Sequence, residues 1–334
     1  MLSAQFTKYT LDFKNPSGTS RGILKKKYTY FIELKKDGQK VMGEANMFSG
    51  LSSDDVANYE EVLQEVCLHI GDYKNNYHEQ LKDFPSIVFG LEQAFLKLEN
   101  KEAICFRNDF TAGKAGIPIN GLIWMGSEAF MREQIADKLN DNFSCIKMKI
   151  GAIAFEKELA ILTNLRKEYS KEKLELRVDA NGAFSPEEAL EKLERLAALD
   201  IHSIEQPIRA GQVGEMANLC RQTPLAIALD EELIGIHDYE LKEALLDTIA
   251  PQYIILKPSL VGGFKACDEW IDLAEKRNIA WWITSALESN VGLDAIAQYA
   301  FSKQSKLYQG LGTGSLFLNN TVSSLYIEDA KLWR

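Results

Sequence analysis

Cysteine and long apolar runs are both scarce in this chain. The five cysteines are odd in number, widely spaced and free of any C-x-x-C pair, so we expect reduced core thiols rather than a disulfide framework. No apolar run reaches the roughly 18 residues of a membrane-spanning helix, and the first residues do not form a signal sequence. We therefore expect a cytoplasmic protein without a membrane partner.

Basic residues are also in deficit, because 38 lysines and arginines stand against 48 acidic residues and the net charge is −10. Nucleic acids and anionic membranes repel an acidic surface, so we expect neither as a partner. An anionic substrate would have to meet a local cationic site. The chain has 334 residues, 46% of them hydrophobic, which is enough for one large domain with its own core and a second, smaller domain. Its composition does not indicate an oligomeric state.

Residues 1–115 predict a small α+β domain, because strand-like segments come first and helical segments follow. The predicted strands are 5–14, 22–34 and 40–45, and the predicted helices are 52–70 and 86–98. The turn-rich run Asn15 to Ser20 predicts a loop, and Asp37-Gly38 predicts a hairpin turn. Ser53, Asp54 and Asp55 are expected to cap the first helix.

Residues 116–314 alternate between strand and helix. The eight predicted strands are 117–123, 144–150, 174–179, 201–205, 225–229, 253–257, 280–284 and 307–310. Seven helical segments fill the gaps, the clearest beginning at Ser185-Pro186. Strands joined through helices are parallel, so we predict an α/β barrel with the tail 315–334 returning to the first domain.

Charged residues stand at the carboxyl ends of successive predicted strands. Asp179, Glu205, Asp230 and Lys257 follow one another at intervals of about 26 residues, one strand-plus-helix unit. The carboxyl ends of parallel strands share one face, so the three carboxylates are expected to converge there. Converging carboxylates need a cation, and oxygen ligands suit Mg²⁺. A single acid of this kind is usually a loop residue without a role, but the repeated spacing favours a site.

Two lysines lie on the second predicted strand of the barrel. Lys147 and Lys149 are two residues apart, so both side chains point to the same face, while Lys257 lies across the barrel. A neighbouring ammonium and a divalent cation favour the neutral form of a lysine, which can then act as a base. Lys-x-Lys usually marks a solvated edge strand, but this strand is apolar. The set suits removal of a proton α to a carboxylate.

A glycine-rich run, Gly310-Leu311-Gly312-Thr313-Gly314, offers a nucleotide-binding alternative. It lacks the full spacing of a dinucleotide loop and the acidic residue about 20 positions further on. We interpret these glycines as positions where backbone amides approach a ligand. The four histidines have no metal-ligand spacing and are assigned no role.

Taken in order, these motifs resemble the enolase superfamily, in particular its muconate-lactonising-like branch. The matching segments are Lys147-Met148-Lys149, Asp179-Ala180-Asn181, Glu205-Gln206-Pro207, Asp230-Glu231 and Lys257-Pro258. The resemblance covers nearly the whole chain. It implies a modified TIM barrel, (β/α)₇β, over 116–314, with an N-terminal α+β capping domain over 1–115.

The resemblance also implies roles for individual residues. Mg²⁺, or Mn²⁺ as its substitute, would be held by Asp179, Glu205 and Asp230. The substrate would be a small carboxylate. The implied catalytic residues are Lys149 and Lys257, on opposite sides of the substrate, and Lys147, which assists the base.

Within this branch the chain is most similar to the o-succinylbenzoate synthases, lyases of menaquinone biosynthesis. The implied reaction is the syn dehydration of 2-succinyl-6-hydroxy-2,4-cyclohexadiene-1-carboxylate. The implied substrate contacts are Arg177, Asn181, Ser285, Gly310, Gly312 and Arg21. Loops around Ser17 to Arg21 and Asn46 to Leu51 are expected to close over the site.

Two alternatives stay open. An N-succinylamino acid racemase or a dipeptide epimerase of the same branch would use both lysines as acid and base. Dipeptide epimerases resemble one another in an Asp-x-Asp after the last barrel strand, where this chain has Gly310-Leu311-Gly312. A non-catalytic metal-binding protein is the other alternative, and it would need no paired lysines.

Overall fold

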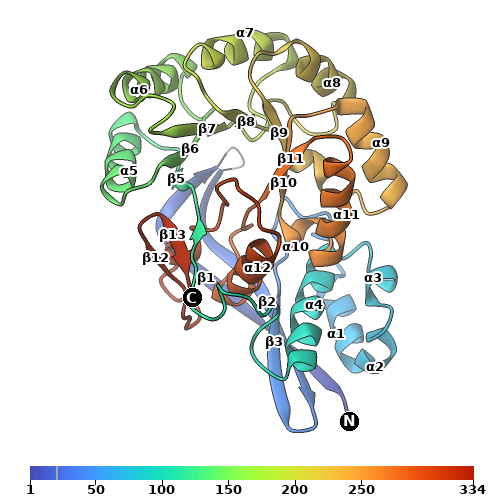
Figure 1. Ribbon diagram of the computed structural model, residues 1–334. Coiled ribbons are helices and arrows are strands. Elements are labelled where there is room, and N and C mark those ends of the chain that lie inside the picture. The colour runs from blue at the N-terminus through green and yellow to red at the C-terminus, as the bar shows by residue number, and fades with distance from the viewer. Residues whose placement is uncertain (20–21) are drawn as a thin grey trace.

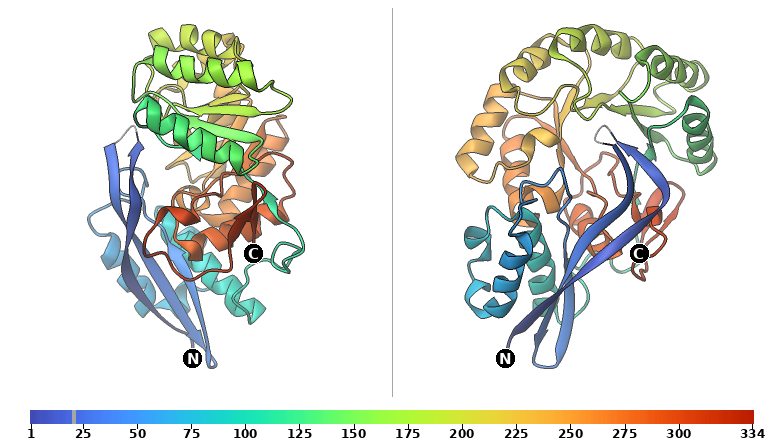
Figure 2. Two further views of the ribbon diagram at one scale, coloured as in Figure 1. Left: turned by 90° about the vertical axis from the view of Figure 1, so that its left-hand side faces the viewer. Right: turned by 180° about the vertical axis from the view of Figure 1, so that it is seen from behind.

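The computed structural model describes residues 1–19 and 22–334. An N-terminal antiparallel sheet and four helices lie against a curved parallel sheet, and further helices cover the outside of that sheet (Figure 1). Figure 2 shows the antiparallel sheet lying along one side of the barrel. The predicted fold class, a modified barrel with an α+β cap, is confirmed.

The cap sheet is a three-stranded meander in the order β1-β2-β3. Its strands are β1 (Ser3–Thr19), β2 (Gly22–Lys36) and β3 (Gln39–Ala45). Asp37 and Gly38 have positive φ angles of 52° and 83°, as the predicted hairpin turn requires. The predicted loop at Asn15 to Ser20 is wrong as far as Thr19, because a shift in register between Asp12 and Ser17 lets strand pairing resume.

The cap helices are α1 (Tyr59–Leu68), α2 (Ile70–Tyr73), α3 (Tyr77–Gln80) and α4 (Pro85–Asn100). Helix α4 packs closely on β3 where two glycines meet. A Cβ atom on Gly43 would lie 1.9 Å from the carbonyl oxygen of Gly90, so this approach excludes any side chain there. The contact joins the sheet and helix of the cap into one core.

The predicted helix start at Ser52 is wrong, because α1 begins at Tyr59. The predicted capping residue Asp54 serves a different helix. Its carboxylate accepts hydrogen bonds from the backbone N–H of Ser86 at 2.9 Å and from the Ser86 hydroxyl at 2.6 Å, in the first turn of α4. Because Asp54 and Ser86 are 32 residues apart, no short spacing in the sequence identifies Asp54 as the cap of α4.

Asp54 gives a prediction for the pH dependence of stability. Burial raises its pKa to about 6, despite the bonds from Ser86. The folded state therefore holds this proton more tightly than the unfolded state does, so this group's contribution to stability rises as pH falls from about 6 to about 4. The full span is about 3 kcal/mol.

Asp54→Asn is expected to remove this contribution. Urea unfolding between pH 4 and 7.5 should show the variant gaining stability relative to the wild type as pH rises through 6. Glu61→Gln, at an exposed position on α1 of the same cap, is the control. Parallel pH curves for wild type and Asp54→Asn would contradict the assignment.

The barrel contains a parallel sheet of seven strands. In chain order they are β5 (Gly121–Ile123), β6 (Cys145–Lys149), β7 (Glu175–Asp179), β8 (Ser203–Glu205), β9 (Ile227–Leu229), β10 (Tyr253–Leu256) and β11 (Ala280–Ile283). The predicted eighth strand at 307–310 is reduced to two isolated parallel bridges. Gln309 bridges to Ile119 and Gly310 to Thr284, so this segment joins both edges of the curved sheet.

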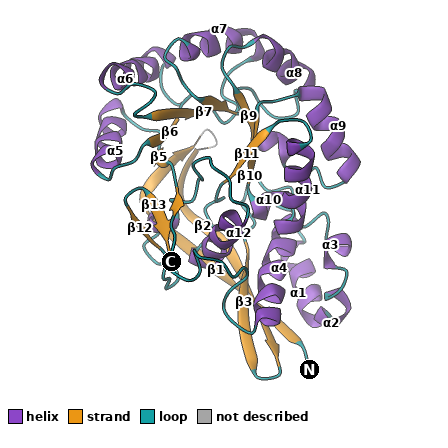
Figure 3. Ribbon diagram, in the orientation of Figure 1, coloured by secondary structure: helices purple, strands orange, loops and turns teal. Residues whose placement is uncertain are grey.

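Helices cover the outside of the barrel strands (Figure 3). They are α5 (Glu128–Asn140), α6 (Phe155–Glu168), α7 (Pro186–Ala197), α8 (Val213–Gln222), α9 (Tyr239–Ile249), α10 (Pro258–Val261), α11 (Gly263–Glu275) and α12 (Asn290–Ser302), with 3₁₀ turns η1 (Glu231–Leu233) and η2 (Gly314–Leu316). Helix α7 begins as predicted, with a capping box at Ser185 and buried Ala189, Leu193 and Leu196.

The C-terminal tail contacts both parts of the chain. Strands β12 (Tyr326–Glu328) and β13 (Lys331–Trp333) form a sheet with β4 (Ile117–Pro118), so the first predicted barrel strand is split in two. The Leu318 N–H donates to the Asp12 carbonyl of β1 at 2.8 Å. Within the described residues no helix is long and apolar enough to cross a bilayer, and all five cysteines are buried and unpaired.

Two carboxylates of the cap accept hydrogen bonds from the first turns of barrel helices. Glu44 accepts from the Gly292 N–H of α12 at 2.8 Å, and Glu92 accepts from the Lys265 N–H of α11 at 3.0 Å. Negative charge is favourable at these helix ends, and both bonds cross from cap to barrel. The cap is thereby held in a fixed position over the barrel.

Candidate active site

The three acids predicted to converge lie on neighbouring strands. Asp179 ends β7, Glu205 ends β8, and Asp230 follows β9 directly. Asp179 is paired with Glu205 in the sheet register, and all three side chains are at most 2% exposed. The parallel order of the strands therefore buries three carboxylates together at the carboxyl end of the barrel.

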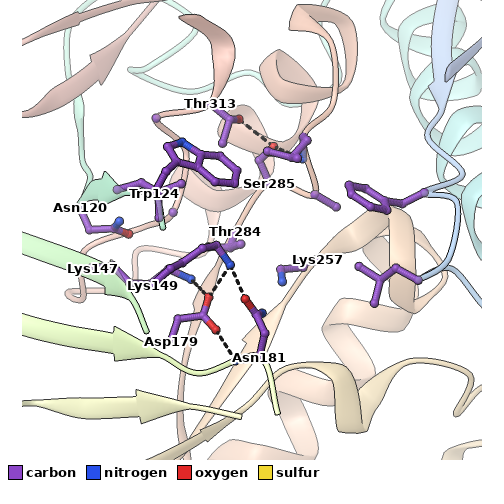
Figure 4. A pocket seen from close by; sticks show the side chains of 17 residues that line it. Asn120, Trp124, Lys147, Lys149, Asp179, Asn181, Lys257, Thr284, Ser285 and Thr313 are labelled. Carbon is purple, nitrogen blue, oxygen red and sulfur yellow. Dashed lines mark hydrogen bonds and ion pairs between the residues drawn. The ribbon is translucent and has the colours of Figure 1, made fainter. Parts of the chain in front are cut away.

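Lysines from β6 neutralise part of this charge. The Lys147 ammonium donates to Asp179 Oδ2 at 2.9 Å and also contacts Glu205. The Lys149 ammonium donates to the same Asp179 oxygen at 3.0 Å and to Asn181 Oδ1 at 2.6 Å. Alternation along β6 thus brings both side chains to one face, as predicted (Figure 4).

The third lysine approaches from the other side of the pocket. Lys257 follows β10, its ammonium contacts Asp230, and it lies 3.7 Å from Glu205 Oε1. Lys149 and Lys257 both line the same pocket. The structure therefore brings together the six predicted catalytic and metal-binding side chains.

Burial and charge act in opposite directions on these groups. Burial alone would raise the pKa of Asp179, but the ammonium groups of Lys147, Lys149 and Lys257 outweigh it and hold that pKa well below its usual range. Burial and the charges of Glu231 and Glu205 raise the pKa of Asp230 despite Lys257.

Contact with carboxylates also shifts the pKa of two of the lysines. Burial lowers the pKa of Lys147, but its bonds to Asp179 and Glu205 raise it further and the net shift is upward. The same holds for Lys257 beside Asp230 and Glu205. Direct contact with carboxylates keeps both side chains cationic.

The three carboxylates are also the candidate ligands of a metal ion. In the described part of the chain, no three His, Cys, Asp or Glu side chains are arranged to hold a metal ion, and ammonium groups lie against the carboxylates. The donor set nevertheless fits Mg²⁺: three buried carboxylates supply hard oxygen ligands. Glu205 Oε1 is buried without a hydrogen-bond partner, which leaves an oxygen for a cation.

A pocket lies above these residues. Phe48 and Leu51 of the cap form part of its wall, as predicted for the loop Asn46 to Leu51. The barrel contributes apolar side chains such as Leu122 and Trp124. The other predicted closing loop, Ser17 to Arg21, includes residues outside the described ranges.

Comparison with known proteins agrees with this geometry. The family model described as "Enolase C-terminal domain-like" matches residues 130–325. The o-succinylbenzoate synthase of Desulfotalea psychrophila is 45% identical over 99% of this chain and 98% of its own length. The chain belongs to the o-succinylbenzoate synthase family of the enolase superfamily. Members of this family are hydro-lyases.

Two further comparisons place the family match in context. The crystal structure of MenC from Desulfotalea psychrophila has a TM-score of 0.87 and 42% identity, covering 100% of this chain and 99% of that one. An L-amino acid-D/L-Glu epimerase of Francisella philomiragia is 23% identical over 81% of this chain and 79% of its own length. The epimerase is thus the more distant relative.

Most substrate contacts implied by the synthase family resemblance line the pocket. Asn181, Ser285, Gly310 and Gly312 are all part of its wall, while Arg21 lies outside the described residues. Gly310 has a specific steric role, because a Cβ atom there would lie 1.7 Å from the hydroxyl oxygen of Thr284.

Arg177 does not line the pocket, contrary to its predicted role as a substrate contact. It lies two residues before Asp179 on the same face of β7, and so deeper in the barrel. Its guanidinium donates to Glu175 at 2.6 Å and to the Tyr308 carbonyl at 3.0 Å, and it stacks on Trp282 at 4.3 Å. Arg177 is therefore buried beneath the site.

Several pocket residues were missed from the sequence. They are Asn120, Leu122, Trp124, Thr284, Ala286, Leu287 and Thr313. Alternation could have found Asn120, Leu122 and Trp124, which follow one another at intervals of two residues along and just after the first predicted barrel strand. The remaining pocket residues lie near the segment that closes the barrel, and no local pattern in the sequence predicts how that segment packs.

Proposed function

We propose that the protein is an o-succinylbenzoate synthase. It dehydrates 2-succinyl-6-hydroxy-2,4-cyclohexadiene-1-carboxylate to o-succinylbenzoate in menaquinone biosynthesis. One observation carries this proposal. Lys149 and Lys257 reach the same pocket from opposite strands of the barrel, and three buried carboxylates lie between them. The 45% identical synthase supports the choice of substrate.

Asp179, Glu205 and Asp230 would hold Mg²⁺, for which Mn²⁺ would substitute. The three carboxylates and the unpartnered Glu205 oxygen support this assignment. When bound, the ion supplies positive charge to the carboxylate oxygens on which an enediolate develops.

Lys149 is proposed as the base. Its nitrogen has two protein acceptors, Asp179 Oδ2 and Asn181 Oδ1, so one further tetrahedral position remains for the substrate. The Trp124 ring centroid lies 6.0 Å from the nitrogen, and both residues line the pocket. Lys149 would remove the α proton and then return it to the departing hydroxyl on the same face, which gives syn elimination.

Lys257 and Lys147 are proposed to act through charge. Lys257 is anchored by Asp230 and Glu205, so its ammonium stabilises negative charge on the enediolate from the face opposite Lys149. Lys147 lies between Asp179 and Glu205 and assists by holding the carboxylate that orients Lys149. Phe48 and Leu51 of the cap exclude water from the bound ring.

The remaining assignments follow from the same chemistry. The partner is a small carboxylate, and the acidic surface does not favour nucleic acid or an anionic membrane. A cytoplasmic location is proposed on the five unpaired cysteines, which suit a reducing compartment.

An N-succinylamino acid racemase or dipeptide epimerase is the alternative, since two facing lysines also suit 1,1-proton transfer. The absence of the Asp-x-Asp, with Gly310-Leu311-Gly312 in its place, weighs against the epimerase. Purified protein is expected to dehydrate the synthase substrate with Mg²⁺, and EDTA should abolish turnover. In deuterated water it should not exchange the α proton of N-succinylamino acids. Rapid exchange without dehydration would favour the racemase.

A further inference from the structure

The hydroxyl of Ser285 has no hydrogen-bonding capacity left for a substrate carboxylate. The hydroxyl donates to Glu288 at 2.5 Å, and its oxygen accepts from the Thr313 hydroxyl at 2.8 Å and from the Leu287 N–H at 3.0 Å. A serine hydroxyl has one proton to donate, and Glu288 takes it. The carboxylate of a succinyl arm therefore needs another donor in this pocket.

Asn120 supplies an uncommitted donor. Its side chain lines the pocket and is only 5% exposed, yet its amide group has no hydrogen-bond partner among the described residues. Its polar atoms are not among the fully buried ones, so the amide is accessible from a cavity and available to a ligand. In Figure 4 Asn120 lies beside Trp124, on the side of the pocket away from Lys257.

The neighbours of Asn120 complete a polar corner. Its backbone N–H donates to the Gln309 carbonyl at 3.0 Å, which fixes it to the segment that closes the barrel. Thr284, which bridges to Gly310 in that segment, also lines the pocket, and its hydroxyl has no partner among the described residues. Two neutral donors thus adjoin the closing segment, apart from the lysines.

We propose that Asn120 is a specificity-determining residue that donates from its side-chain amide to the terminal carboxylate of the succinyl arm, with the Thr284 hydroxyl as a second donor. This inference rests on the proposed function. The lysines and the acid cluster act on the ring carboxylate, and a separate neutral subsite recognises the second carboxylate. A hydrogen bond to a charged group contributes more than a neutral one, so the effect on affinity is measurable.

The test is equilibrium binding to the full-length protein with Mg²⁺ present. The two probes are o-succinylbenzoate and 2-butanoylbenzoate, in which a methyl group replaces the terminal carboxylate. Asn120→Leu is expected to weaken binding of o-succinylbenzoate about 10- to 100-fold and to leave 2-butanoylbenzoate unchanged. Asn120→Asp should weaken o-succinylbenzoate further by repulsion, again without affecting 2-butanoylbenzoate. Asn140→Leu, at the exposed end of α5, is the control.

Comparing the affinities of the two probes separates a role of Asn120 in substrate recognition from a role in folding. A purely structural role would weaken both probes equally, and that result would overturn the proposal, as would unchanged binding of o-succinylbenzoate by Asn120→Leu. With the dehydration substrate, KM should rise while kcat is largely retained. If wild-type protein fails to dehydrate that substrate, the proposed function itself fails. If it turns over while both Asn120 variants keep the wild-type KM, only the Asn120 assignment fails.

Discussion

Lys149→Ala is expected to lower kcat for dehydration by about two to four orders of magnitude, the contribution typical of a positioned general base. The expectation rests on geometry: Lys149 reaches the pocket with only Asp179 and Asn181 as partners. Asp179 keeps its bond from Lys147 in the variant, so the acid cluster should stay intact. Mg²⁺ should therefore still raise the melting temperature. Stopped-flow assays and thermal unfolding measure both quantities.

The control and the rescue sharpen this test. Lys157→Ala, an exposed lysine on α6, should behave like the wild type. A small primary amine such as ethylamine should restore part of the activity of Lys149→Ala, because the truncated side chain leaves space beside the substrate. Substantial turnover in the variant without added amine would refute the assignment of the base.

The positions of the acids and lysines could be predicted because one rule fixes them. Parallel strands separated by helices bring their carboxyl ends to one face, so a residue's place relative to its strand end is enough. Asp179, Glu205 and Asp230 met this rule although the sheet begins at Ser203 and Ile227, two residues later than predicted for those strands. The carboxyl ends of these strands, where the candidate catalytic residues lie, were predicted more accurately than their starts.

Features that depend on distant partners could not be predicted. Asp54 is a residue type that commonly caps the helix following it, but its carboxylate accepts its hydrogen bond from Ser86 in the more distant helix α4. Arg177 shares a strand face with Asp179, yet depth in the barrel directs it to Glu175 and Trp282. Alternation predicts the face that a side chain occupies, and tertiary packing decides which layer of that face is open to a ligand.

Glu205→Gln is expected to abolish Mg²⁺-dependent turnover while leaving the protein folded. Glu205 is the central carboxylate of the cluster, contacts both Lys147 and Lys257, and has a buried oxygen without a hydrogen-bond partner. Glutamine keeps the shape of the side chain but removes the negative charge. The site then gains one net positive charge, which opposes binding of a divalent cation.

The readout that isolates this effect is the melting temperature with and without Mg²⁺. A ligand that binds only the folded state stabilises it in proportion to RT ln(1 + [L]/Kd), so saturating Mg²⁺ should raise the wild-type melting temperature by a few degrees. Glu205→Gln should lose this increase, Lys149→Ala should keep it, and Glu215→Gln, exposed on α8, should match the wild type. A wild-type increase retained in Glu205→Gln would mean that the ion is held elsewhere, and the mechanism built around these three carboxylates would then be wrong.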